Sequence, residues 1–134
     1  MIFPKTFIIS PISPHAYYTG EVEWVNSTFG VLLVTCPEDI AKAIAMALLE
    51  KRLAASVNMI PAVSSLYWWR DKIESSLETL LLIKTRVDAF ENIKKVVEDM
   101  HPYEVPQIVL LPIVAGSEDY LSWIDRELNP RPEN

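Results

Sequence analysis

The spacing of apolar residues changes several times along the chain, and each change predicts a different element. Two short, almost wholly apolar runs at 31–34 and 107–112 are typical of buried strands. Three longer stretches, about 37–52, 86–100 and 118–128, repeat their apolar residues every three or four positions. That period indicates three helices.

Residues 53–84 have the pattern of a long β-hairpin. Both arms are rich in β-branched, aromatic and aliphatic residues, and the charged segment Arg70–Glu74 separates them, so the return arm is expected from Glu78. The outgoing arm is much longer than a typical strand of about 5–6 residues. Pro61 cannot donate a ladder hydrogen bond, and we expect it to mark a bend where one strand hands over to another.

Three consecutive aromatic residues lie close to the tip of this hairpin. Side chains alternate along a strand, so Tyr67 and Trp69 point to one face and Trp68 points to the other. A chain of this length cannot bury large rings on both faces of a projecting hairpin. We therefore expect Tyr67, Trp68 and Trp69 to lie at an interface with another copy of the chain.

The predicted order of elements is strand, helix, strand, strand, helix, strand and an extra C-terminal helix. With right-handed crossovers this order gives an α+β fold of the split βαβ kind, in which a four-stranded antiparallel sheet carries helices on one face. No helix is expected on the other face, which is a second reason to expect self-association. We place one domain at 29–128, an N-terminal extension at 1–28 with a short strand near 21–25, and a tail at 129–134.

Composition and charge narrow the class of protein. The chain has 134 residues, half of them apolar, which suits one folded domain. A net charge of −6 and the lack of a basic stripe argue against a nucleic-acid partner. No apolar run approaches the roughly 18 residues of a membrane span, and the first residues lack the continuous apolar region of a signal peptide. One cysteine excludes an internal disulfide and suits a reducing compartment, so we expect a cytoplasmic protein.

The candidate chemistry gathers at one rim of the predicted sheet. The first strand ends and the second helix ends at this edge, which brings together Thr35, Cys36, His101, Tyr103 and Glu104. A helix N-terminus attracts anions, and a Cys36–His101 pair would suit a soft or borderline metal ion. The alternative is structural, with Cys36 as a small buried residue and His101 donating to a carbonyl of the last helical turn.

Seven segments carry a resemblance to a known family. They are Val34–Pro37, Glu50–Ala55, Asn58–Pro61, Ser65–Trp68, Ile83–Thr85, His101–Pro106 and Tyr120–Trp123. In this order, and from about residue 29 to residue 128, they resemble the CutA divalent-cation tolerance proteins. The resemblance implies a ferredoxin-like fold and a tight homotrimer with a PII-like arrangement of subunits, held partly by the long hairpin strands. It also implies an association with tolerance of copper or other divalent ions, and no catalytic reaction.

The chain departs from the family at the positions of the proposed metal ligands. Family members linked to copper carry a cysteine, a histidine and an acidic residue where this chain has Val34, Met100 and Gln107. Cys36 is a different cysteine, two residues beyond the family position. The family's ligand set therefore does not transfer, and Cys36 and His101 are the candidate metal ligands of this chain.

Three functions remain open. The first is a homotrimeric binding or signalling module whose subunit clefts hold a small anion, a metabolite or a metal ion, with no cofactor required. The second is an ion-binding tolerance protein that uses Cys36 and His101, joined by Met100 if the ion is Cu(I). The third is an enzyme with Cys36 as nucleophile and His101 as base. We expect the first, and no enzyme.

Overall fold

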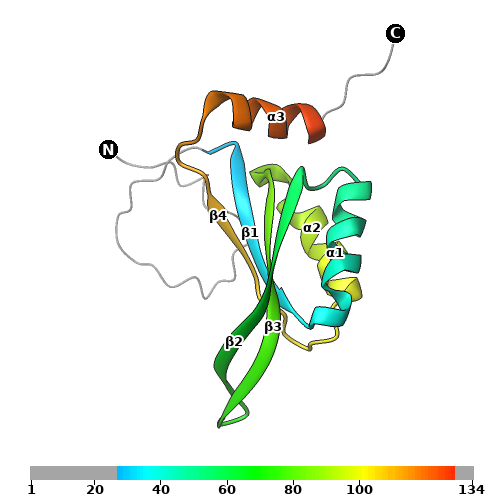
Figure 1. Cartoon of the computed structure of the whole chain (residues 1–134), viewed down its shortest axis with the longest axis vertical. Helices are drawn as coiled ribbons and strands as arrows, with labels where there is room; N and C mark the ends of the chain where they lie inside the picture. Colours follow the sequence, from blue (N-terminus) through cyan, green and yellow to red (C-terminus); the bar gives the residue numbers. More distant parts are fainter. Residues whose placement is uncertain (1–26, 129–134) are drawn as a thin grey trace.

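The computed structural model describes residues 27–128, which form a single sheet with helices packed around it (Figure 1). The predicted strand near 21–25 lies outside these residues. The strands are β1 (Phe29–Cys36), β2 (Ser56–Trp69), β3 (Lys72–Arg86) and β4 (Ile108–Pro112). The helices are α1 (Glu38–Glu50), α2 (Phe90–Met100) and α3 (Glu118–Leu128), and a single 3₁₀ turn, Val87–Ala89, precedes α2.

The sheet has the order β2-β3-β1-β4, and all neighbouring strands are antiparallel. Helices α1 and α2 lie side by side on one face of it (Figure 1). Alternate residues of β1, namely Leu32, Val34 and Cys36, are fully buried against these helices. The predicted α+β fold with an extra C-terminal helix is confirmed. None of the helices in the described region is long and apolar enough to cross a membrane.

The opposite face of the sheet is covered only at one end. There α3 crosses the sheet, where Arg86 Nη1 donates to Asp125 Oδ1 at 2.8 Å and the Ser56 and Tyr120 hydroxyls lie 3.5 Å apart (Figure 1). The prediction that this face has no helix is therefore wrong at this end. The rest of the face stays open, with apolar side chains of β4 such as Val109 exposed to solvent.

The hairpin is longer than the charge pattern predicted, and it projects far beyond the sheet (Figure 1). Only Arg70 and Asp71 form the turn, and β3 starts at Lys72, which pairs with Trp69. Both turn residues have positive φ, 50° and 64°, as a type I′ turn requires. The prediction of a turn over Arg70–Glu74 with a return arm from Glu78 is wrong, because this turn lacks the usual Asn-Gly signal.

Pro61 produces a β-bulge rather than the predicted handover between two strands. The strand β2 runs on through it, and the pairing shifts between Ile60, opposite Leu80, and Val63, opposite Glu78. The strand thus advances three residues while its partner advances two. Ala62 takes up the extra residue at φ 58°.

The bulge decides which side chains of the hairpin share a face. Before the bulge, the even-numbered positions of β2 share a face with the even-numbered positions of β3. The extra residue reverses the alternation of β2, so beyond the bulge its odd-numbered positions share that face. Tyr67 and Trp69 therefore share a face with Glu78, and the Tyr67 hydroxyl lies 2.7 Å from Ser76 Oγ on that face. Without the extra residue, both rings would point to the opposite side.

Candidate functional site

A cleft of about 1000 Å³ lies between the hairpin and the loop that follows α2. The hairpin contributes Ser64–Arg70 and Glu78, and the loop contributes Tyr103–Gln107. Thr35, at the end of β1, forms part of the wall. Three of the five predicted rim residues, Thr35, Tyr103 and Glu104, therefore line one cavity.

His101 joins the end of α2 to the end of β1. Its Nδ1 accepts a hydrogen bond from the Tyr103 backbone N–H at 3.2 Å, so the ring proton is on Nε2, which donates to the Thr35 carbonyl at 2.7 Å. The ring also packs against Tyr103, with 4.6 Å between centroids. The partner carbonyl belongs to a strand and not to the last helical turn. His101 is 7% exposed, and both of its nitrogens are occupied in holding the loop that forms the cleft wall.

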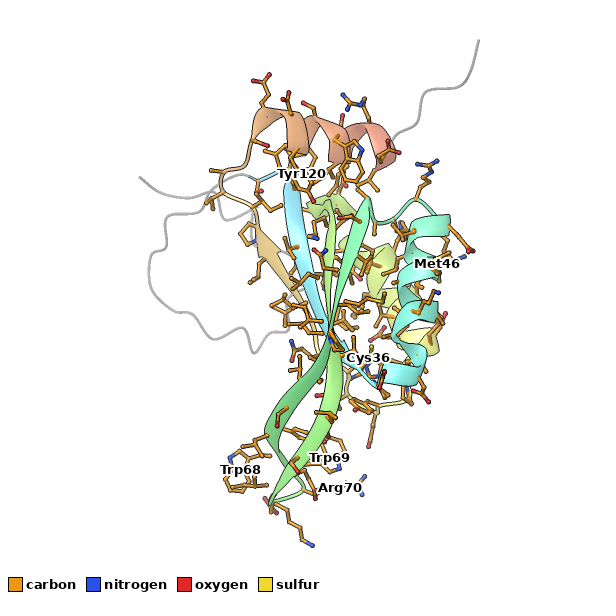
Figure 2. All side chains as sticks on the ribbon, viewed as in Figure 1. Cys36, Met46, Trp68, Trp69, Arg70 and Tyr120 are labelled. Carbon is orange, nitrogen blue, oxygen red and sulfur yellow. The ribbon has the colours of Figure 1, made fainter. Side chains whose placement is uncertain are left out.

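Cys36 lies on the other side of β1 from Thr35, buried beneath the helices (Figure 2). The pKa of its thiol is raised from 9.0 to about 11, mostly by burial and in addition by the negative charges of Glu78 and Asp39. The thiol is consequently protonated at neutral pH, whereas the thiolate is the form that attacks substrates or binds metal ions. Cys36 is absent from the described lining of the cleft.

Glu78 is the residue of the cleft that the sequence did not reveal. It lines the cleft but is only 4% exposed, and among residues 27–128 no donor reaches its Oε2 atom. A glutamate next to the charged hairpin turn looks like an ordinary surface residue in the sequence. The one available signal was its phase, because positions 78, 80 and 82 alternate onto one face of a strand that is otherwise apolar there.

Tyr103 lies next to Glu78 and responds to its charge. The pKa of the Tyr103 phenol is raised from 10.0 to about 12, mostly by burial and in addition by the negative charge of the Glu78 carboxylate and by the hydrogen bond between the two side chains. Glu78 also contributes to the raised pKa of Cys36. Glu78 therefore lies close enough to affect two ionisable groups on different elements.

The far face of the hairpin carries a strip of four apolar side chains that this subunit leaves in solvent. Beyond the bulge, Leu66 and Trp68 of β2 share this face with Ile73 and Leu77 of β3, and Trp68 pairs directly with Ile73. All four are between 65% and 74% exposed. Figure 2 shows Trp68 at the edge of the projecting hairpin, away from the helices. We call these four residues the hairpin strip.

The tip of the hairpin is tied to the loop across the mouth of the cleft. Arg70 Nη2 lies 3.4 Å from Glu104 Oε2, and the Arg70 guanidinium stacks over the Trp69 ring at 5.4 Å from its centroid. Both partners of the ion pair are largely exposed, so it stabilises the fold little. The ion pair does, however, engage Arg70, which is the one basic side chain among the residues that line the cleft.

The three positions that carry the proposed metal ligands in copper-linked family members lie in different surroundings in this chain. Val34 is fully buried in the core, Met100 packs against the core, and Gln107 lines the cleft. Across residues 27–128, no group of three or more histidine, cysteine, aspartate or glutamate side chains is placed to hold a metal ion.

Comparison with known proteins identifies close relatives over most of the chain. Residues 30–127 match the family model of the CutA1 divalent ion tolerance protein. The divalent-cation tolerance protein CutA of Thermus thermophilus is 47% identical over 95 residues, which cover 70% of this chain and 92% of the relative. A CutA homolog of Xenopus laevis is 36% identical over 125 residues, 92% of this chain and 83% of the relative. That alignment is long enough to include residues before 29.

Solved structures give the same result for the fold. The structure of the periplasmic divalent cation tolerance protein CutA from Archaeoglobus fulgidus is 38% identical to this chain, with a TM-score of 0.73. The match covers 75% of this chain and 99% of that protein.

Proposed function

The chain belongs to the CutA1 divalent ion tolerance family, and we propose that it acts there as a homotrimeric binding module without a catalytic reaction. The resemblance stated from the sequence motifs is thereby confirmed at the level of the family. The trimer, the cleft of each subunit as a binding site, and the link to copper are parts of the proposal.

The hairpin strip is the observation that carries the proposal. Leu66, Trp68, Ile73 and Leu77 present a contiguous apolar surface on a two-stranded ribbon that has no helix behind it. An isolated two-stranded hairpin is marginally stable in water, so a ribbon of this length needs support from another surface. A second and third copy of the chain supply that support if their hairpins pack against one another.

The cleft supports ligand binding more than catalysis. A Cys36-dependent enzyme needs a thiolate near the substrate, but burial keeps this thiol protonated. The thiol also lies on the opposite side of β1 from the cleft. The proposed base, His101, uses both ring nitrogens in structural hydrogen bonds. The described lining of the cleft carries two carboxylates and one arginine that is already paired, which is unfavourable for an anion such as a phosphate.

Direct binding of copper or zinc by Cys36 and His101 is the second candidate function. It would require Cys36 to lose a proton in a buried site and His101 to give up a hydrogen bond to Thr35 or Tyr103. We therefore propose that this chain acts in divalent-cation tolerance by binding a ligand in the cleft, and not by holding a metal ion between Cys36 and His101. We keep the cytoplasm as the proposed compartment, on the ground of the single free cysteine.

Calorimetric titration with Cu(I) and with Zn(II) separates the two candidates. The natural chain and Cys36→Ser should bind each ion with the same affinity, because Cys36 takes no part in the cleft. Loss of a tight site in Cys36→Ser alone would restore the Cys36–His101 metal site and contradict the proposal.

A further inference from the structure

Glu78 is a buried carboxylate whose surroundings leave one oxygen without a hydrogen bond. The side chain is 4% exposed, and no donor from the described part of the chain reaches Oε2. Burying a charged acceptor without a partner costs folding free energy. A donor supplied from outside the subunit would remove that cost.

Among residues 27–128, no ion pair joins a basic side chain to Glu78. The one basic residue in the described lining, Arg70, is engaged with Glu104 at the tip of the hairpin. Thr35, Ser64 and Gln107 are neutral. No basic side chain in the cleft lining is therefore left to offset the charge of Glu78.

Aromatic rings line the cleft together with this carboxylate, a combination that organic cations favour. Tyr103 lies next to Glu78, and the bulge at Pro61 turns Tyr67 and Trp69 onto the same face of the hairpin. Ring faces attract ammonium and guanidinium groups, and more strongly where water is excluded. A metal ion is a poorer fit, because in residues 27–128 no second and third acidic, histidine or cysteine ligand joins Glu78.

We infer that the cleft is a binding site for a small organic cation, a primary amine or guanidine whose protonated nitrogen pairs with the Glu78 carboxylate while the rest of the ligand lies against the rings of Tyr67 and Tyr103. The bond is charge-assisted on both sides, which makes it stronger than a neutral hydrogen bond. This inference names the ligand class of the cleft and so rests on the proposed function.

Two matched pairs test the inference, one of ligands and one of variants. The ligands are 1,4-diaminobutane, a dication at neutral pH, and 1,4-butanediol, its neutral analogue of similar shape. The variants are Glu78→Gln, which keeps the shape of the side chain, and Glu74→Gln, which removes an exposed charge from the same face of β3. Each titration is followed by calorimetry on the full chain, and light scattering gives the mass of each variant.

The natural chain should bind diaminobutane and should not bind butanediol. Glu78→Gln should weaken the affinity for diaminobutane by about tenfold or more, which corresponds to the loss of one charge-assisted bond, while Glu74→Gln leaves it within about twofold. Equal binding of the two ligands, or an unchanged affinity in Glu78→Gln, would overturn the inference. If Glu78→Gln does not fold, the comparison of the two ligands on the natural chain still decides.

Two further outcomes would each contradict one of the proposals. If the natural chain binds no amine and Glu78→Gln loses its assembled mass, a lysine or arginine of a second copy occupies the site, and the small-ligand inference fails. If the natural chain is itself a monomer, the proposed assembly fails, whatever the amine titration gives.

Discussion

Replacing Trp68 by alanine distinguishes a solitary subunit from an assembly, because the expected loss in the free energy of unfolding differs greatly between the two. In the single subunit Trp68 is 71% exposed, so its removal creates no cavity and should change the free energy of unfolding by less than about 0.5 kcal/mol. In a trimer packed through the hairpin strip, the same indole is buried. A large aromatic side chain buries about 150–250 Å², so covering its exposed part at about 25 cal/mol per Å² gives about 3–4 kcal/mol per subunit.

The assay is urea unfolding at several protein concentrations, with the mass of each sample measured in parallel. Met46→Ala is the matched control, because Met46 is a half-exposed apolar side chain on the outer side of α1, far from the hairpin (Figure 2). Trp68→Ala should lose about 3–4 kcal/mol and dissociate at concentrations where Met46→Ala stays assembled. Equal and small losses in both variants would refute burial of the hairpin strip.

Three further predictions concern pH and the backbone. The folded-state pKa is raised from 9.0 to about 11 for Cys36 and from 10.0 to about 12 for Tyr103. The stability that their neutral forms contribute is therefore complete below pH 9 and is lost as pH rises toward 12. A melting temperature that stays constant from pH 9 to pH 12 would contradict this. Ala62→Gly should raise the free energy of unfolding by about 0.5–1 kcal/mol in urea titrations, because φ is 58° at this position and only glycine adopts it without strain; a loss of stability would show that the bulge is not strained. Gly30→Ala should lower it by about 1–3 kcal/mol, since a Cβ atom there would lie 2.7 Å from Leu110 Cδ1 and 3.0 Å from the Leu111 carbonyl oxygen; an unchanged midpoint would mean that β4 moves freely.

The sequence predicts the sheet and the helices that cover it, because the buried apolar residues recur at regular spacings in these elements. Leu32, Val34, Ile93 and Val97 are the apolar positions of their elements and are all fully buried. The hairpin was harder to predict, since Arg70 and Asp71 adopt positive φ without the glycine that normally signals such a turn. Local sequence does not encode that geometry, and the long ladder between β2 and β3 imposes it.

The site was predictable only in part, for a related reason. The ends of β1 and α2 follow from topology, so Thr35, Tyr103 and Glu104 were expected at one rim. The bulge after Pro61 reverses the alternation of β2, and only a known register shows that Tyr67 then shares a face with Glu78. The phase of Glu78 along β3 was the one signal in the sequence, and it does not show that the Oε2 atom lacks a donor, which only the packed structure reveals.

In the proposed trimer, copies of this chain cover one another's hairpin strips. Sedimentation equilibrium of the full chain, from low micromolar concentrations upward, tests that claim most directly. We predict one species of three chains of 15.3 kDa each, about 46 kDa, at every concentration. A single species of 15.3 kDa would leave Leu66, Trp68, Ile73 and Leu77 in water and would contradict the account.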